Sequence, residues 1–265
     1  MCVSNPNSPM SMQYPLVVGG AGGIGRAIAL VLASRPEVRR VDIVDRAPLA
    51  PIADETAGAE KLAVHRFDLE SGDFSFFERF VQGDTDGLFI TAGFGRLALF
   101  EELDEAYIER SFTVNSVAPI RIVRRFYGRL LAATPFPCAV MVSIAGFMSS
   151  PFFSIYGATK AALKIFIESV NVELERAGSS NRLLNVSPGS IAGTGFSGGA
   201  TDLKLTTPLA REIIAHAEAG DDLFIPRYEE VFREVLERYH TDFRAEGRHS
   251  YDYKLSSGRI DRNRR

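Results

Sequence analysis

The sequence has no tryptophan and only two cysteines. Cys2 lies near the start of the chain and Cys138 opens an apolar run, so the two indicate neither a disulfide framework nor a cysteine metal site. We expect no metal centre in this protein.

Long apolar runs are also missing. No stretch of the chain approaches the roughly 20 apolar residues that a helix needs to cross a bilayer. Residues 1–12 lack the basic start and apolar centre of a signal peptide, and we expect them to form a disordered arm. A cytoplasmic protein without a membrane partner is the resulting expectation.

The charges are nearly balanced, with 30 lysines and arginines against 33 aspartates and glutamates. A formal net charge of −3 gives no indication of a nucleic-acid partner. The one basic patch is residues 257–265, which we expect to be a solvated C-terminal tail.

The 265 residues are 46% hydrophobic and include 23 glycines, which is enough for one large α/β domain. Short apolar runs alternate with helical periodicity along nearly the whole chain. Strands are predicted at 16–18, 41–45, 63–67, 87–93, 138–143, 183–186 and 251–255, and helices after Gly25 and at 74–81, 101–111, 113–133, 154–178, 207–218 and 228–240. This alternation predicts a Rossmann-type doubly wound parallel sheet with helices on both faces, in a single domain over residues 13–256.

A glycine-rich turn, Gly19 to Gly25, separates the first strand from the first helix. Glycine at this place allows a tight turn and lets the backbone touch a pyrophosphate at the positive end of the helix. A merely flexible loop is the alternative, but the flanking strand and helix favour nucleotide binding.

Asp45 ends the second strand, 20 residues after Gly25. An acid at this distance accepts hydrogen bonds from an adenosine ribose and repels a 2′-phosphate, so it favours NAD over NADP. Arg46 follows directly and could neutralise this preference, which keeps NADP possible. A strand-end turn residue is the alternative interpretation of Asp45.

Tyr156 and Lys160 stand four residues apart in a predicted helix, which places both side chains on one face. A nearby ammonium lowers the pKa of a phenol toward the range of a general acid or base. A surface tyrosine beside a solvated lysine is the alternative, and the pair alone does not decide between them.

Several motifs in register resemble those of the short-chain dehydrogenases/reductases in their compact single-domain form. Gly19 to Gly25 is similar to the Thr-Gly-x-x-x-Gly-Ile-Gly turn of that family, with Val18 where the threonine usually stands. The other matches are Thr91-Ala92-Gly93, Asn115, Ser143 at 13 residues before Tyr156, the Tyr156-x-x-x-Lys160 signature, and Ser187-Pro188-Gly189-Ser190-Ile191.

The resemblance implies an NAD(P)-dependent oxidoreductase that interconverts a secondary alcohol and a ketone by hydride transfer. Tyr156 would be the general acid/base, Ser143 would bind the substrate oxygen, and Asn115 would hold a water that links Lys160 to solvent. The implied cofactor contacts are Gly19, Gly22, Gly23, Ile24, Gly25, Asp45, Asp68, Leu69, Ala92, Gly93, Asn115, Tyr156, Lys160, Pro188, Gly189, Ile191 and Thr194. We also expect a homodimer or homotetramer.

Three departures from the family pattern stand out. Ile90 and Thr91 replace two asparagines, which affects only local bonding. Gly193 stands where the family usually has a threonine, so Thr194 becomes the candidate there. The predicted substrate loop near 190–225 is followed by an acidic and aromatic segment, 228–253, to which no family role can be transferred.

The substrate is the least determined part of this prediction. An apolar wall is expected from Phe94, Gly146-Phe147-Met148, Pro151-Phe152-Phe153 and Phe196, and would suit an apolar or ring-bearing alcohol or ketone. Core or subunit packing is the alternative for these phenylalanines.

Two other functions stay open. Arg96, Lys204 and Arg211 could bind an anionic group, as in a sugar or polyol phosphate reductase, or could be ordinary solvated surface. A non-catalytic dinucleotide-binding regulatory protein would not need Ser143, Tyr156 and Lys160 together. A sugar-nucleotide epimerase usually needs a larger C-terminal substrate domain than this chain supplies.

Overall fold

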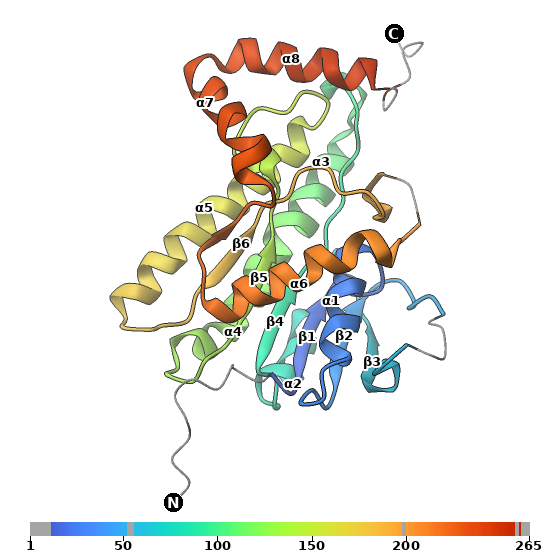
Figure 1. Cartoon of the computed structure of the whole chain (residues 1–265), viewed down its shortest axis with the longest axis vertical. Coiled ribbons are helices and arrows are strands. Elements are labelled where there is room, and N and C mark those ends of the chain that lie inside the picture. The colour runs from blue at the N-terminus through green and yellow to red at the C-terminus, as the bar shows by residue number, and fades with distance from the viewer. Residues whose placement is uncertain (1–11, 52–55, 198–199, 258–259, 261–265) are drawn as a thin grey trace, which may run out of the picture.

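The computed structural model describes residues 12–51, 56–197, 200–257 and 260 (Figure 1). Of the expected N-terminal arm only Met12 is described, and it is buried with its side chain against Gly87. The rest of that arm and most of the expected basic tail lie outside the described residues.

Seven parallel strands form one sheet in the order β3-β2-β1-β4-β5-β6-β7. The strands are β1 Pro15–Val18, β2 Val41–Asp45, β3 Leu62–Arg66, β4 Gly87–Ile90, β5 Cys138–Met141, β6 Leu183–Val186 and β7 Leu223–Phe224. The order reverses between β1 and β4, and ligands of such sheets bind outside the carboxyl ends of the strands at this reversal. The predicted Rossmann-type doubly wound sheet is confirmed.

Eight α-helices accompany these strands in the described part of the chain. They are α1 Gly23–Ala33, α2 Glu78–Val81, α3 Glu105–Phe112, α4 Ala118–Leu131, α5 Ser154–Arg176, α6 Leu203–Ala219, α7 Arg233–Thr241 and α8 Phe243–Ser256. Side chains of α1 and α6 pack on one face of the sheet, and those of α2, α4 and α5 pack on the other. None of the described helices has the length and apolarity of a membrane span.

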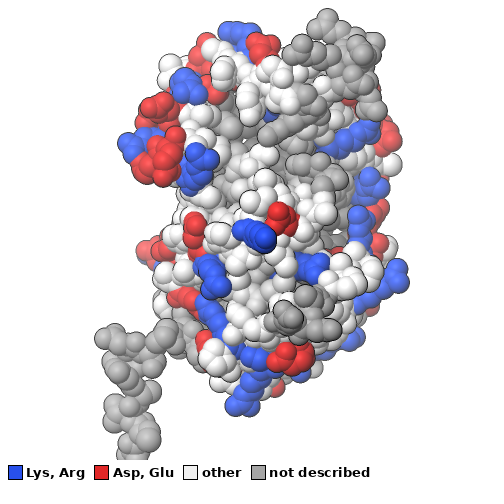
Figure 2. Space-filling model, turned by 45° about the vertical axis from the view of Figure 1, so that its right-hand side comes forward, with Lys and Arg blue, Asp and Glu red and all other residues white. Residues whose placement is uncertain are grey.

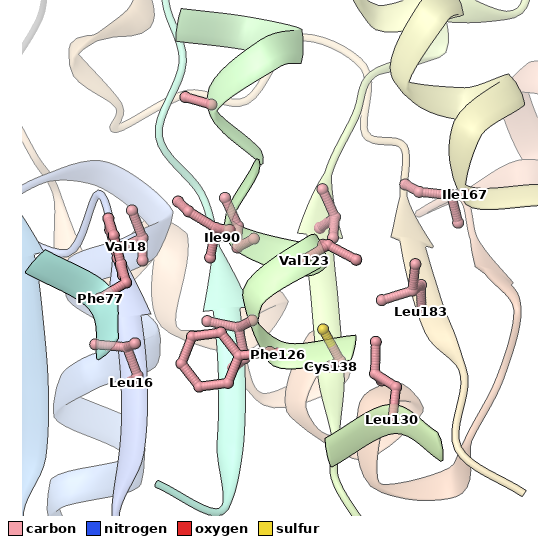
Figure 3. Packing of buried hydrophobic residues seen from close by; sticks show 14 of the residues in the cluster. Leu16, Val18, Phe77, Ile90, Val123, Phe126, Leu130, Cys138, Ile167 and Leu183 are labelled. Atoms are coloured by element: carbon pink, nitrogen blue, oxygen red, sulfur yellow. The ribbon is translucent and has the colours of Figure 1, made fainter. Parts of the chain in front are cut away.

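Alternation along the strands divides the buried residues between two cores. Leu16 and Val18 of β1 point to the core under α4 and α5, while Val17 points to the core under α1 and α6. Figure 3 shows the first core, where Phe126 of α4 lies over the sheet near Leu16 and Ile90. Truncating a fully buried phenylalanine such as Phe126 to alanine typically costs about 3–5 kcal/mol, so these cores hold the layers together.

The prediction of a last strand at 251–255 was wrong, because these residues belong to α8. The carboxylate of Asp242 accepts from the backbone N–H groups of Arg244 and Ala245 and starts the helix. The sequence pattern was misleading because Tyr251, Tyr253 and Leu255 alternate with polar residues, as in a strand. The helix contacts of this segment are not visible in the sequence. The two-residue strand β7 was missed, since such a length leaves no periodicity.

Figure 2 shows lysines and arginines interspersed with aspartates and glutamates over the visible face. This mixture agrees with the nearly balanced composition. In the described residues, no group of three or more His, Cys, Asp or Glu side chains could hold a metal ion.

Candidate active site

The glycine turn is packed too tightly for side chains at two of its positions. Gly19 has a φ of +88°, and a Cβ added there would lie 2.4 Å from the backbone nitrogen of Ala92. A Cβ on Gly25 would lie 2.3 Å from the carbonyl oxygen of Gly19. Glycine therefore lets the start of α1 approach the end of β4, as the fingerprint predicts.

The N-terminus of α1 presents backbone N–H groups that suit a pyrophosphate. Gly22 is the N-cap and supplies no capping side chain, and Gly23, Ile24 and Gly25 form the first turn. The nearest atom to a Cβ added at Gly22 is the Thr201 hydroxyl oxygen at 3.5 Å, so the turn is not filled by core side chains. These residues fit a dinucleotide.

Thr201 contacts this turn, and the sequence analysis missed it. Its hydroxyl accepts a hydrogen bond of 2.8 Å from the backbone N–H of Gly23, and Thr194 also lies beside that glycine. Thr194 in turn donates to the carbonyl of Ile191 at 3.1 Å. Gly23 and Thr201 are 178 positions apart, so no local pattern could have predicted their contact.

Asp45 lies beside the glycine turn, at the carboxyl end of β2. Its carboxylate accepts from the N–H of Ala21 at 3.0 Å and from the N–H of Ala47 at 2.9 Å. Asp68 and Leu69 are the second and third residues after β3, at the same edge of the sheet, and the Asp68 carboxylate accepts from the N–H of Glu70. The structure thus gathers these predicted residues at the end of the sheet where the glycine turn lies.

Tyr156 and Lys160 lie on one face of α5, as their spacing predicts, and both are buried. The amino group of Lys160 donates to the carbonyl oxygen of Met141, the last residue of β5, at 2.8 Å. It lies 5.8 Å from the centre of the Tyr156 ring. The lysine therefore ties the face of α5 that carries Tyr156 to the end of β5.

Burial shifts both of these groups toward their neutral forms. It raises the pKa of Tyr156 to about 12, and the hydrogen bond with Ser143 only partly opposes this effect. Burial also lowers the pKa of Lys160 to about 7. For Tyr156 this direction is opposite to the one expected from a neighbouring ammonium, because desolvation is the largest effect on its pKa.

Ser143 follows β5 and lies next to the turn after β6. Its side-chain oxygen accepts from the N–H of Ala145 at 3.2 Å and lies 3.5 Å from the carbonyl oxygen of Pro188. The N–H of Ile144 donates to the same carbonyl at 3.0 Å, and Gly189 follows. Ser143 thus lies next to Pro188 and hydrogen-bonds Tyr156.

Asn115 is fully buried in a π-helical turn, Thr113–Val117, which joins α3 to α4. The two helices expected at 101–111 and 113–133 are therefore continuous through this turn. The amide oxygen of Asn115 accepts from the N–H of Phe94 at 3.0 Å, and the amide nitrogen donates to the Phe94 carbonyl at 2.8 Å. The same nitrogen donates to the Thr159 hydroxyl at 3.3 Å. Asn115 thus holds the segment after Ala92 and Gly93, and its water-holding role stays a prediction.

Only part of the expected apolar wall surrounds the tyrosine. The rings of Phe153 and Phe196 lie 5.3 and 5.0 Å from that of Tyr156, centre to centre. Phe94 packs instead on Tyr107. Three other members contact the C-terminal segment: Phe152 packs on Tyr251, and Phe147 and Met148 pack with Leu236 and Ile225. Arg96, Lys204 and Arg211 are all exposed.

A family model described as short chain dehydrogenase matches residues 13–202 of this sequence. The chain belongs to the short-chain dehydrogenase family. The short-chain dehydrogenase srdE of Neurospora crassa is 30% identical over 179 residues, which cover 64% of this chain and 59% of that protein. Retinol dehydrogenase 8 of Homo sapiens is 29% identical over 167 residues, which cover 60% of this chain and 53% of that protein.

The fold comparison agrees with this family. A short chain dehydrogenase from Burkholderia cenocepacia, solved in complex with NADP, has a TM-score of 0.71 at 19% identity, over 91% of this chain and 98% of its own. The present chain spans little more than half the length of the two curated relatives. Helices α7 and α8 lie beyond residue 202, where the match to the family ends.

The lowered pKa of Lys160 predicts a pH-dependent stability. Because the unfolded chain holds a proton on this lysine up to its ordinary pKa of 10.5, stability contributed here rises with pH above about pH 7. We compare the free energies of unfolding in urea of Lys160→Met and the wild type. Relative to the wild type, the free energy of unfolding of Lys160→Met should be highest near pH 7 and should fall toward about pH 9.5. Lys204→Met is the control for loss of a surface lysine. If the difference in free energy of unfolding between the wild type and Lys160→Met does not change with pH, this expectation is contradicted.

Proposed function

We propose that this protein is an NAD(P)-dependent oxidoreductase that interconverts a secondary alcohol and a ketone by hydride transfer. The observation that carries the proposal is the meeting of Ser143, Tyr156 and Lys160 at the carboxyl ends of the strands, next to a glycine turn that fits a dinucleotide. A bound nicotinamide would supply the hydride donor or acceptor and, when oxidised, a positive charge.

Tyr156 is the proposed general acid/base. Its neutral form is favoured by burial, so it is poised to donate a proton to the oxygen of a ketone that accepts hydride. In the direction of alcohol oxidation it accepts that proton, which requires a positive charge nearby to lower its pKa. Ser143, hydrogen-bonded to Tyr156, holds the same substrate oxygen. Lys160 would contact the ribose of a bound nicotinamide from the same helix face.

The contacts around Tyr156 favour an apolar, ring-bearing substrate. Phe153 and Phe196 present aromatic rings beside the tyrosine, whereas the three candidate cations Arg96, Lys204 and Arg211 are exposed. Rings of this kind stack on flat or cyclic groups. The name of retinol dehydrogenase 8 among the relatives points to a substrate of the same broad kind. A sugar or polyol phosphate is therefore the weaker candidate.

NAD is the proposed preferred cofactor, and NADP remains the alternative. The carboxylate of Asp45 is fixed by the Ala21 N–H at the place where the adenosine ribose would lie. A fixed negative charge there disfavours a 2′-phosphate. Exposed Arg46 adjoins it and works in the opposite direction.

We propose that the protein forms a homo-oligomer, in the cytoplasm. Apolar side chains are exposed on the outer faces of α4 and α5: Val117 just before α4, Leu131 at its end, and Ile165 and Val172 on α5. Ile165 and Val172 are seven residues apart and share one helix face. Such a surface on two adjacent helices suits contact with the same surface of a second copy.

Tyr156→Phe should lower turnover by about 10³-fold, since removing a general acid/base typically loses 10²–10⁴-fold in rate. The dissociation constants of NADH and NADPH, from their fluorescence on binding, should change less than about threefold because the ring remains. Turnover is measured by absorbance of the reduced cofactor with acetophenone, tetralone, butanone and the matching alcohols. Tyr107→Phe, a buried tyrosine packed on Phe94, is the control. Undiminished turnover of Tyr156→Phe would refute the mechanism, and cofactor binding without turnover in the wild type would favour a regulatory protein.

Asp45→Asn keeps an oxygen for the Ala21 N–H and removes only the charge. The ratio of the NADPH to the NADH dissociation constant should fall by about tenfold, equivalent to about 1.4 kcal/mol. Asp84→Asn, which removes an exposed acid, should leave this ratio unchanged. If Asp45→Asn also leaves it unchanged, Asp45 does not determine the cofactor.

Replacing both Ile165 and Val172 by glutamate should shift the protein toward monomer in sedimentation velocity, because charge would be buried in the contact. Leu205→Glu, at an equally exposed apolar position on α6, is the matched control. A wild type that sediments as a monomer at all concentrations would disprove the oligomer, and an unchanged oligomer in the double variant would place its contact elsewhere.

A further inference from the structure

Helix α8 packs on residues 149–153, the segment that leads into the catalytic helix α5. Gly247, Tyr251 and Lys254 follow one another at intervals of four and three residues, so they share one face of α8. A Cβ on Gly247 would lie 3.5 Å from the Ser149 hydroxyl oxygen, and the Tyr251 ring lies 4.5 Å from the Phe152 ring. Figure 1 shows α8 next to α7 at the top of the view.

Lys254 makes the polar contact between the two segments. Its side chain is buried, and its amino group donates to the Ser150 hydroxyl and to the Pro151 carbonyl, each at 2.7 Å. The same group lies 5.5 Å from the centre of the Phe153 ring. One amino group thus contacts three nearly consecutive residues and restricts the backbone that joins them.

The segment that Lys254 holds is strained. Phe152 has a φ of +65°, in the left-handed region that a bulky aromatic residue rarely occupies. Its ring is buried against Tyr251, and its carbonyl accepts from the N–H of Ala98 at 3.0 Å. A strained conformation persists only where its surroundings enforce it, and α8 provides much of these surroundings.

The strained segment is continuous with the active site. The carbonyl of Phe153 accepts from the N–H of Gly157 at 2.7 Å, which is part of the first turn of α5. The ring of Phe153 lies against the Tyr156 ring and 6.1 Å from the Phe196 ring. Any shift of residues 150–153 therefore moves a ring beside the catalytic tyrosine.

Helix α7 is joined to α8 by an ion pair and also packs near Ser143. Arg238 of α7 binds the carboxylate of buried Glu246 on α8 at 2.8 Å. Phe232, just before α7, lies over Gly189, where a Cβ would come within 2.6 Å of its ring. Leu236 of α7 packs with Ile144, next to Ser143. Helix α7 thus packs on the turn that carries Ser143, and α8 packs on the segment that leads to Tyr156.

We propose that Lys254 is a positioning residue that fixes residues 150–153 and, through them, the Phe153 ring beside Tyr156. Helix α8 then determines which ring-bearing substrates can lie against the tyrosine. The part that concerns substrates rests on the proposed oxidoreductase activity, whereas the part that concerns positioning does not.

Hydrogen exchange of the protein without substrate tests the positioning directly. Lys254→Met keeps the apolar stem and removes the donors, so amides of residues 149–157 should exchange about tenfold faster or more, while those of 16–32 stay unchanged. Arg248→Met, which removes an exposed cation from the same helix, should change neither region. Ser150→Ala removes one acceptor from the opposite side and should give a smaller increase confined to the same amides.

Uniformly faster exchange in Lys254→Met would mean that the lysine only stabilises the fold, and unchanged exchange in 149–157 would overturn the proposal. If Lys254→Met does not fold, the Ser150→Ala result decides.

Steady-state kinetics test the specificity role. In Lys254→Met, the KM for tetralone should rise at least about fivefold, while the KM for butanone and the dissociation constant of NADH should stay nearly unchanged. An equal effect on both ketones would refute the specificity role. Absence of any wild-type turnover would count against the activity and leave the exchange result to judge the positioning.

Discussion

The buried amino group of Lys160 is the contact on which the site depends. By donating to the carbonyl of Met141 it sets the height of α5 relative to the end of β5, and therefore the place of Tyr156 relative to Ser143. The same burial keeps both ionisable groups close to neutrality. A charge placed next to them would act in a low-dielectric environment, where electrostatic effects are larger than in water.

A second group of contacts joins neighbouring strand ends to this centre. Asn115 ties the turn after β4 to α5 through Phe94 and Thr159, and the Pro188 carbonyl ties the turn after β6 to Ile144. Each contact uses a polar side chain or backbone group at the carboxyl end of a parallel strand. The parallel sheet thus brings residues that are far apart in sequence to one edge without requiring long loops.

Much of this arrangement could be predicted because it depends on short, local patterns. The alternation of apolar runs and helices predicted the sheet, and the spacing of Tyr156 and Lys160 predicted their common face. Contacts between distant segments could not be predicted in this way. Thr201 meets Gly23 across 178 positions. Residues 251–255 of α8 resembled a strand in sequence, because the contacts of the helix face that carries Gly247, Tyr251 and Lys254 cannot be predicted from a local pattern. The pKa of Tyr156 was expected to fall because of Lys160, but it is raised. The burial that raises it is also a tertiary property, so it could not be predicted from the spacing.

Lys254 and Ser150 are 104 positions apart, and α8 follows every strand of the sheet in chain order. The sheet and both of its cores can therefore assemble before the strained turn at Phe152 has anything to hold it. Domains form from the N-terminal side during synthesis, so the segment at 150–153 gains its contacts with α8 last. A chain interrupted before α8 would contain all seven strands and lack the contacts of Tyr251 and Lys254 that hold residues 150–153.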